Sequence, residues 1–194
     1  MIIAMSGPPA SGKGTLAKML AKELNLPHYD FGLMFRAIAF LSPHFSLNHL
    51  LKFAKYGWLR VEGWGGIWFK YNNGPVSLFE DLKTEKVALL AANIASTNLS
   101  AMIEISQAMV KHEDFVCDGR TCGSEIYPNA DYKFYITAEE AERLGRRFGD
   151  DKAERKIREE LDRVRLRVPH GAVIIDTTGK ILEESFRELL FFFK

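Results

Sequence analysis

The fold class can be predicted from one stretch near the start of the chain, Gly7-Pro8-Pro9-Ala10-Ser11-Gly12-Lys13-Gly14-Thr15, because it fits the pattern G-x-x-x-x-G-K. An apolar run, Ile2–Met5, precedes it, and residues 15–24 follow with apolar side chains on one helical face. Glycines at positions 7 and 12 can take backbone angles closed to other residues, so successive N–H groups can point inward beside a helix N-terminus. The pattern predicts a strand, a phosphate-binding loop and a helix, with the Lys13 charge between the β- and γ-phosphates.

The rest of the chain alternates between strand and helix patterns, which predicts an α/β fold with a parallel sheet flanked by helices. We expect helices at residues 31–41, 85–95, 99–111 and 182–192, and strands at 115–118, 132–136 and 172–176, the last of them buried. Two aromatic runs around a Gly-rich turn at 63–66 predict a hairpin. The cluster Phe191-Phe192-Phe193 is read as part of a final helix docked on the sheet, with a partner-binding patch as the alternative.

Composition limits the function classes. The 194 residues are 47% hydrophobic, which excludes disorder as the main state. Lys and Arg number 26 against 25 Asp and Glu, so the chain lacks the polycationic character of nucleic-acid and membrane-surface binders. No basic leader and no apolar run of about 18 residues is present. We therefore expect a cytoplasmic protein with neither nucleic acid nor membrane as a partner.

Cysteine and histidine usage indicates no metal centre. Two cysteines, Cys117 and Cys122, are too few for a disulfide framework, and no second pair or nearby histidine completes a zinc site. The five histidines show no ligand spacing and are expected to be surface or half-buried side chains. Both cysteines are predicted to be free thiols.

The loop departs from the strict motif at one position. Gly14 stands where Ser or Thr would hold Mg²⁺, and the hydroxyl comes one residue later at Thr15. The sequence Gly-Lys-Gly-Thr resembles nucleoside monophosphate kinases, and this resemblance implies that Mg²⁺ is held mainly through phosphates and water rather than by protein ligands. The Asn-Lys-x-Asp motif of GTPases is absent.

Three further segments carry charged groups suited to anions. The first segment is Asp30-Phe31-Gly32-Leu33-Met34-Phe35-Arg36. Its arginine lies on the opening turns of a predicted helix, where it can bind a phosphate through two hydrogen bonds or lie on the surface. Asp118-Gly119-Arg120-Thr121-Cys122-Gly123 follows an apolar strand, where α/β proteins bind ligands. Arg158, Asp162 and Arg165 share one helical face, which is either a polyanion site or a solvated face of i, i+4 ion pairs.

The chain resembles bacterial cytidylate kinases over nearly its whole length. The resemblance rests on five motifs in the same order: the loop, D-x-G-x-M-x-R, D-G-R-x-x-G, P-x-A-D-x-K and Ile-Asp-Thr-Thr. The resemblance implies a P-loop NTPase fold and transfer of the γ-phosphate of ATP to CMP or dCMP, in a monomer whose partners are small nucleotides. It implies a kinase core at 1–41, 97–137 and 168–194, a nucleoside monophosphate-binding insertion at 42–96 and an arginine-rich lid at 138–167.

The same resemblance assigns site residues. ATP is expected on residues 7–15 and Arg147, with Mg²⁺ as cofactor. The catalytic candidates are Lys13, Asp118, Arg120, Arg158 and Arg165, with Asp118 as an orienting carboxylate. The acceptor candidates are Asp30, Gly32, Arg36, Lys83, Asp118, Gly119, Arg120, Thr121, Asp162 and Arg165.

Several departures from the family concern the acceptor. Phe31 stands where the family carries Ser or Thr, Thr121 where it carries Asp, and Lys83 where it carries Arg, and the lid is shorter than usual. Lost hydrogen bonds of this kind alter or weaken nucleotide preference. Two alternatives stay open: an adenylate-kinase-like enzyme, against which the absent Asp-Gly-Phe-Pro-Arg argues, and an ATP-binding regulator that has lost catalysis.

Overall fold

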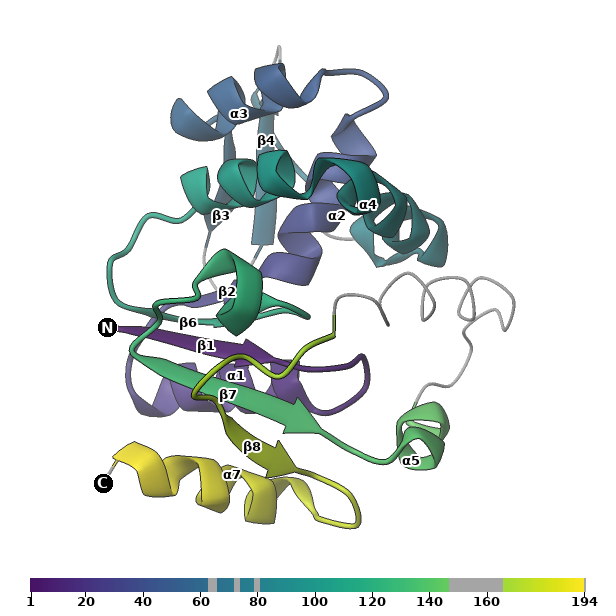
Figure 1. Ribbon diagram of the computed structural model, residues 1–194. Coiled ribbons are helices and arrows are strands. Elements are labelled where there is room, and N and C mark those ends of the chain that lie inside the picture. The colour runs from purple at the N-terminus through teal and green to yellow at the C-terminus, as the bar shows by residue number, and fades with distance from the viewer. Residues whose placement is uncertain (63–65, 72–73, 79–80, 147–165, 194) are drawn as a thin grey trace. The chain divides into compact units, whose positions relative to one another are not determined.

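The computed structural model describes residues 1–62, 66–71, 74–78, 81–146 and 166–193 (Figure 1). These residues fall into two compact units, one of residues 1–30, 112–146 and 166–193 and the other of residues 31–111. The predicted division into core, acceptor-binding insertion and lid concerns function and stays a prediction. Among the described residues, the second compact unit runs from Phe31 to Lys111.

The first unit is built on a five-stranded sheet in the order β2-β6-β1-β7-β8, in which every neighbouring pair is parallel. The strands are β1 (Ile2–Ser6), β2 (His28–Asp30), β6 (Phe115–Asp118), β7 (Tyr132–Thr137) and β8 (Val173–Asp176). The helical elements are α1 (Lys13–Glu23), the π-helical turn η2 (Cys122–Ile126), α5 (Glu140–Gly145), α7 (Leu182–Leu190) and the 3₁₀ turn η3 (Phe191–Phe193). Parallel strands require such crossover connections, and the predicted α/β class is confirmed.

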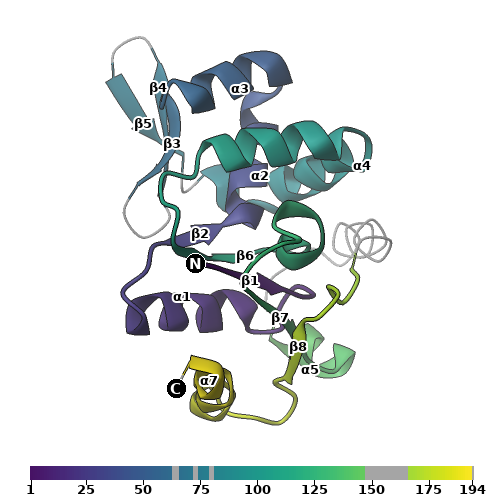
Figure 2. The ribbon, with the colours of Figure 1, turned by 60° about the vertical axis from the view of Figure 1, so that its left-hand side comes forward.

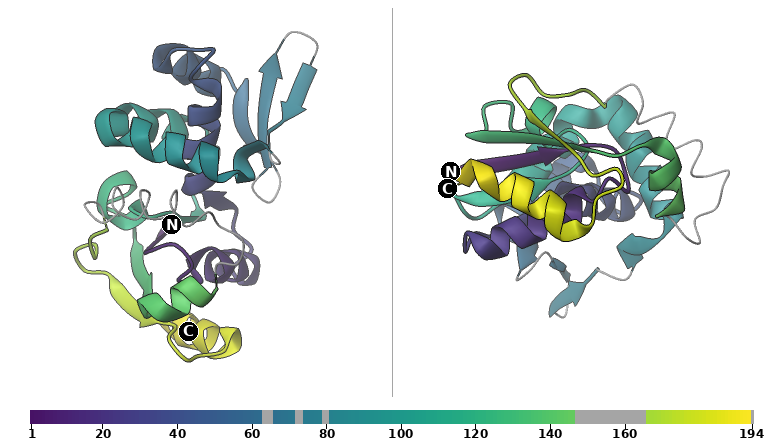
Figure 3. Two further views of the ribbon diagram at one scale, coloured as in Figure 1. Left: turned by 90° about the vertical axis from the view of Figure 1, so that its right-hand side faces the viewer. Right: turned by 90° about the horizontal axis from the view of Figure 1, so that it is seen from below.

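The core of this unit lies between the sheet and the helices α1 and α7, which lie side by side on one face (Figures 2 and 3). Alternate strand residues such as Ile3 and Met5 point to this face and are fully buried with Leu16, Leu20 and Leu189. Each such side chain stabilises the fold by about 1.5–3 kcal/mol through burial. This packing holds the first turn of α1 beside the carboxyl end of β1.

The last strand differs from its prediction. Residues 172–176 were expected to form a buried strand, but β8 is the edge of the sheet, and Ile174 is 55% exposed. Only Ile175 is fully buried, because the helices cover one face of this edge strand. The final helix docks as predicted: Phe193 packs against Phe134 and Tyr132, with ring centroids 5.9 and 4.8 Å apart.

The second unit combines helices with a small antiparallel sheet. Its elements are α2 (Phe31–Leu41), α3 (Leu47–Lys55), β3 (Leu59–Glu62), β4 (Gly66–Tyr71), β5 (Gly74–Ser77), the 3₁₀ turn η1 (Asp81–Lys83) and α4 (Glu85–Ala108). The predicted hairpin is present as β3 and β4, whereas β5 and α3 were not predicted. In α4 the backbone of Asn98 leaves helical angles (φ −130°, ψ 33°), which matches the two separate helical patterns predicted there.

Among the described residues, α4 is one helix long and apolar enough to cross a membrane by length and composition. This is weak evidence, because core helices of soluble proteins meet the same criteria. Buried α4 side chains such as Ala91, Met102 and Ile105 belong to a helix that packs against α2 and α3.

Candidate phosphate-binding site

The loop between β1 and α1 has the backbone geometry that its glycines predict. Gly7 has φ +146°, and a Cβ there would lie 2.0 Å from the carbonyl oxygen of Ile136 on β7, so only glycine fits. Gly12, the N-cap of α1, has φ +86°, and Ala10 between them also has a positive φ of 59°. The loop thus turns sharply and leads directly into the N-terminal turn of α1, whose first N–H groups lack intrahelical partners. Such a turn favours an anion.

Lys13 provides the positive charge of the loop. Its Nζ donates a hydrogen bond to the carbonyl oxygen of Pro8 at 3.3 Å, so the side chain folds back along the loop. Burial lowers the pKa of Lys13; the negative charges of Asp118 and Asp30 oppose this effect, and the positive charge of Arg120 adds to it. A bound polyphosphate would favour the charged form again.

Ser11 adds an unsatisfied polar group at the same place. Its Oγ is buried and has no hydrogen-bond partner among the described residues. Buried hydroxyls are normally paired, and an orphan marks a place where a ligand or water belongs. A phosphate oxygen is the acceptor that a hydroxyl in this loop suits.

Two aspartates end neighbouring strands beside the loop. Asp30 closes β2 and Asp118 closes β6, and the two are register partners. The Oδ2 atom of Asp118 lies 3.4 Å from where a Cβ on Gly14 would be, so the carboxylate borders the first turn of α1. The structure therefore brings Asp30, Asp118 and Arg120 into electrostatic range of Lys13.

The segment after Asp118 is fastened to β1. The N–H of Gly119 donates to the carbonyl oxygen of Met5 at 3.2 Å, and the N–H of Gly123 donates to Ser6 Oγ at 2.8 Å. Thr121 is buried, and its carbonyl oxygen accepts from the N–H of Glu125 at 2.9 Å, which starts the turn η2. These bonds hold the D-G-R segment at the same end of the sheet as the loop.

One residue of the site was not predicted. His28 Nε2 lies 2.7 Å from Asp118 Oδ1, and both side chains are buried, with 1% and 7% exposed. Histidines were expected to be unremarkable surface or half-buried groups, and His28 is a buried partner of a site carboxylate instead. The signal available in the sequence was its position two residues before Asp30, on the same face of a short strand.

A hollow of about 270 Å³ adjoins the loop. Its lining comprises Gly12, Thr15, Leu16, Arg146, Thr177, Lys180, Leu182 and Ser185. The lining combines apolar side chains, hydroxyls and cations, a mixture typical of small-molecule sites.

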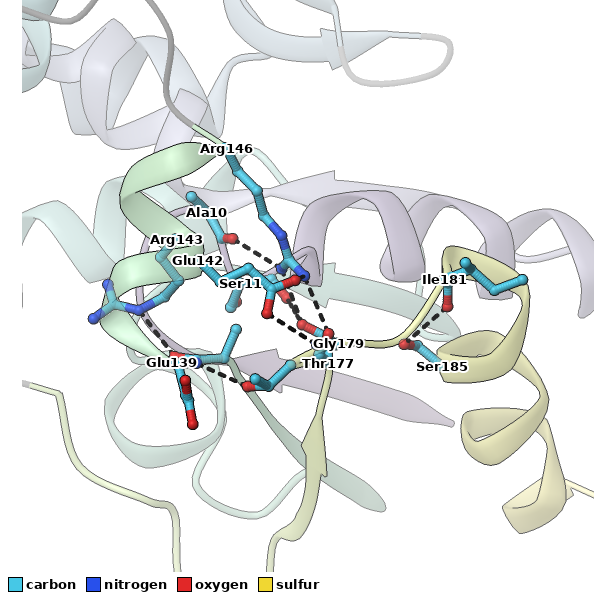
Figure 4. A network of polar contacts seen from close by, with 12 residues as sticks. Ala10, Ser11, Glu139, Glu142, Arg143, Arg146, Thr177, Gly179, Ile181 and Ser185 are labelled. Atoms are coloured by element: carbon cyan, nitrogen blue, oxygen red, sulfur yellow. Dashed lines mark hydrogen bonds and ion pairs between the residues drawn. The ribbon is translucent and has the colours of Figure 1, made fainter.

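Arg146 is held at this hollow by several contacts (Figure 4). Its Nη1 donates to Thr177 Oγ1 at 3.0 Å and to the Ala10 carbonyl oxygen at 3.3 Å, and its Nη2 lies 2.6 Å from Glu142 Oε1. The other oxygen of Glu142 accepts from the Gly179 N–H at 2.9 Å. The Gly179 bond, followed by the Arg146 bond, lowers the pKa of the Glu142 carboxyl.

Arg146 was not among the predicted site residues, whereas its neighbour Arg147 was. The predicted lid residues Arg147, Arg158, Asp162 and Arg165 lie outside the described residues. Adjacent arginines at the end of a helix give no signal in the sequence for which of them faces the loop.

The remaining acceptor candidates lie in the second unit. Arg36 Nη1 donates to the carbonyl oxygen of Leu82 at 3.2 Å, which places it beside the residue that precedes Lys83. Gly32 is exposed in the first turn of α2. Phe31, at the position where the resembling family has a hydroxyl, is 1% exposed and part of the α2 core.

Within the described part of the chain, no group of three or more His, Cys, Asp or Glu side chains converges on a point that could hold a metal ion. The prediction that Mg²⁺ is held through phosphates and water stays a prediction. Both predicted free thiols, Cys117 and Cys122, are buried and unbridged.

Comparison with known proteins gives a consistent family assignment. The cytidylate kinase family model matches residues 3–193. The chain is 30% identical to the cytidylate kinase of Clostridioides difficile, over 98% of this chain and 96% of the relative, and 31% identical to that of Aquifex aeolicus, over 98% and 94%. A crystal structure of the Thermus thermophilus protein TT1252 is similar in fold, with a TM-score of 0.52, 18% identity and coverage of 100% and 95% of the two chains.

Proposed function

Because the chain belongs to the cytidylate kinase family and is thus a nucleoside monophosphate kinase, we propose that it transfers the γ-phosphoryl group of ATP to CMP or dCMP. The observation that carries the proposal is the anion site formed by the glycine loop, Lys13 and the Ser11 hydroxyl, which has no partner among the described residues. Transfer is in line, with the acceptor oxygen and the leaving oxygen on opposite sides of the phosphorus. The products are CDP or dCDP and ADP.

ATP is the donor that the surroundings of the loop suit. Its triphosphate would lie along residues 7–15, where loop N–H groups and Lys13 meet the negative charge. Its base would occupy the adjoining hollow, in which Leu16 and Leu182 offer apolar contacts and the planar Arg146 guanidinium offers a stacking surface. We also assign Arg147 to ATP, as the family resemblance implies.

Mg²⁺ fits this site as a companion of the phosphates. The hydroxyls of Ser11 and Thr15 and the carboxylate of Asp118 offer oxygen atoms. Oxygen atoms are the ligands that Mg²⁺ prefers, and they can also hydrogen-bond to the waters that the ion keeps. When bound, Mg²⁺ neutralises charge on the transferring phosphoryl group. Asp118 itself would orient the donor side of the site, and Lys13 and Arg120 would stabilise the charge that develops during transfer.

The acceptor needs no general base, because its phosphate oxygen is already anionic at pH 7. We assign its phosphate to Arg36 and Arg120 and its remaining contacts to Asp30, Gly32, Lys83, Gly119, Thr121 and Asp162. Arg158 and Arg165 would add charge and exclude water, which otherwise hydrolyses ATP. Because Phe31 is buried and offers no hydroxyl, we expect less strict acceptor choice than a hydroxyl at this position gives. We further propose that the enzyme is a cytoplasmic monomer.

The test is ADP release from ATP and Mg²⁺ with CMP, dCMP, UMP, AMP and GMP as acceptors, beside the Lys13→Ala variant. Preference for CMP or dCMP, lost in the variant, is the expected result. Preference for AMP would favour the adenylate-kinase-like alternative. ATP binding without turnover of any acceptor would contradict the kinase proposal and favour the regulator.

A further inference from the structure

A buried histidine and carboxylate lie beneath the phosphate loop. In the parallel pairing of β2 with β6, His28 is opposite Val116 and Asp30 is opposite Asp118. Side chains two residues apart on a strand point to the same face, so His28 and Asp118 are diagonal neighbours on one side of the sheet. Val116, on this same side, belongs to the core beneath α1. The hydrogen bond therefore lies on the face of the sheet that carries the loop and α1.

The two oxygens of Asp118 have different neighbours. Oδ1 is 2.7 Å from His28 Nε2, and Oδ2 borders the first turn of α1 at Gly14. A carboxylate with one oxygen bound to a ring in the sheet cannot rotate freely, so the second oxygen is directed toward the phosphate loop. The carboxylate that His28 contacts is also the one whose negative charge acts on Lys13.

The proton of the imidazole can be placed by elimination. His28 Nδ1 is buried and has no hydrogen-bond partner among the described residues. A buried N–H without an acceptor is costly, whereas a lone pair without a donor is tolerated better. Nε2 faces a carboxylate, which only accepts hydrogen bonds when ionised. The contacts therefore suit the tautomer that carries its proton on Nε2 and a lone pair on Nδ1, with Asp118 Oδ1 as the acceptor.

We infer that His28 is a positioning residue of this enzyme: as a neutral imidazole it donates Nε2–H to Asp118 and holds that carboxylate against the nucleotide-phosphate site. A charged imidazole would cancel the Asp118 charge, whereas the neutral ring leaves it available to Lys13. The role in turnover rests on the proposed kinase function, because Asp118 is taken there as the orienting carboxylate.

The kinetic test uses five variants of the full chain, one of them a control. His28→Phe retains a ring without an N–H, and His28→Gln retains an N–H donor of similar reach. Asp118→Asn removes the charge, and it is combined with His28→Phe in a double variant. Tyr29→Phe is the matched control, because it removes the hydrogen bond to His112 at 2.6 Å from the same strand but on the opposite face.

We expect His28→Phe to lower kcat for phosphoryl transfer from ATP to CMP by about tenfold or more, with kcat partly restored in His28→Gln and unchanged in Tyr29→Phe. In the Asp118→Asn background, His28→Phe should lower kcat less than about twofold, because its partner is already lost. Equal effects of His28→Phe in both backgrounds, or wild-type kcat in His28→Phe, would overturn the positioning role. Thermal unfolding of each variant ensures that only folded protein is compared.

A second readout does not depend on turnover. Nitrogen-15 NMR of the imidazole should show a neutral ring protonated at Nε2, with a signal that moves when ATP and Mg²⁺ are added and moves less in Asp118→Asn. A charged ring, or a signal unaffected by nucleotide, would overturn the inference. If the unaltered chain turned over no acceptor, the proposed kinase function would fail, and this signal would still decide whether His28 reports on the phosphate site.

Discussion

Replacement of Gly7 by alanine tests the geometry of the phosphate loop most directly. A Cβ at this position would lie 2.0 Å from the Ile136 carbonyl oxygen, whereas real Cβ atoms essentially never approach within 3.0 Å. The loop and β7 must therefore move apart by about 1 Å, and a displacement of that size at a reacting centre costs roughly 100-fold in rate. The φ of +146° adds strain of about 1–3 kcal/mol for a residue with a side chain.

We therefore expect Gly7→Ala to lower kcat for ADP release by about 100-fold and to lower the melting temperature by several degrees. The assay is steady-state turnover with ATP, Mg²⁺ and CMP, together with thermal unfolding followed by circular dichroism. Gly145→Ala is the control: it is the same chemical change in the same unit, and its Cβ meets nothing within 4 Å. The control should retain kcat and melting temperature. Unchanged kcat and unchanged melting temperature in Gly7→Ala would refute the close approach of the loop to β7.

Two further substitutions concern charges near the loop. Burial lowers the pKa of Lys13 below its ordinary 10.5, so the folded chain holds this proton less tightly than the unfolded chain does. The charged Lys13 therefore destabilises the fold at neutral pH. This cost disappears as the pH rises from the lowered pKa of the folded chain toward 10.5. Lys13→Met should abolish turnover and raise the melting temperature at pH 7, with a smaller gain at pH 9.5; a lower melting temperature at pH 7 would contradict this. Glu142 has a pKa below its ordinary 4.5, so its contact with Arg146 is fully present above pH 4.5 and is lost as pH falls through the lower folded value. Glu142→Gln should raise the KM for ATP by about two- to fivefold, and by the same factor at pH 5.5 and at pH 7. If the variant and the unaltered protein had the same KM for ATP at pH 5.5, the prediction would be wrong.

Local patterns in the sequence were sufficient for the loop and for most elements around it. The spacing of Gly7, Gly12 and Lys13 predicted the positive backbone angles of the two glycines and a helix after the loop, because a glycine loop of fixed length between a strand and a helix has few conformations. The helix begins at Lys13, two residues before the predicted segment 15–24. The strand 115–118 and the helix 31–41 were predicted with the bounds that they have in the structure. Their apolar periodicity is contained within each segment and needs no partner to be recognised.

The elements that were missed depend on partners elsewhere in the chain. β5 is a short strand that forms only by pairing with β4, and its own sequence, Gly-Pro-Val-Ser, is a poor strand former. The burial of residues 172–176 was overestimated, because an apolar run does not reveal whether a strand lies at the centre or at the edge of a sheet.

The chemistry of the site divides in the same way. The phosphate loop, the order of the motifs and the position of Asp118 and Arg120 after a strand could be predicted from the sequence, because these features depend on residues adjacent in the chain. Only the tertiary structure placed His28 against Asp118, 90 residues away, and Arg146 against Thr177 and Ala10. Those contacts follow from the strand order β2-β6-β1-β7-β8, which brings distant segments together. Strand order is set by the packing of the whole unit, and no local pattern of residues encodes it.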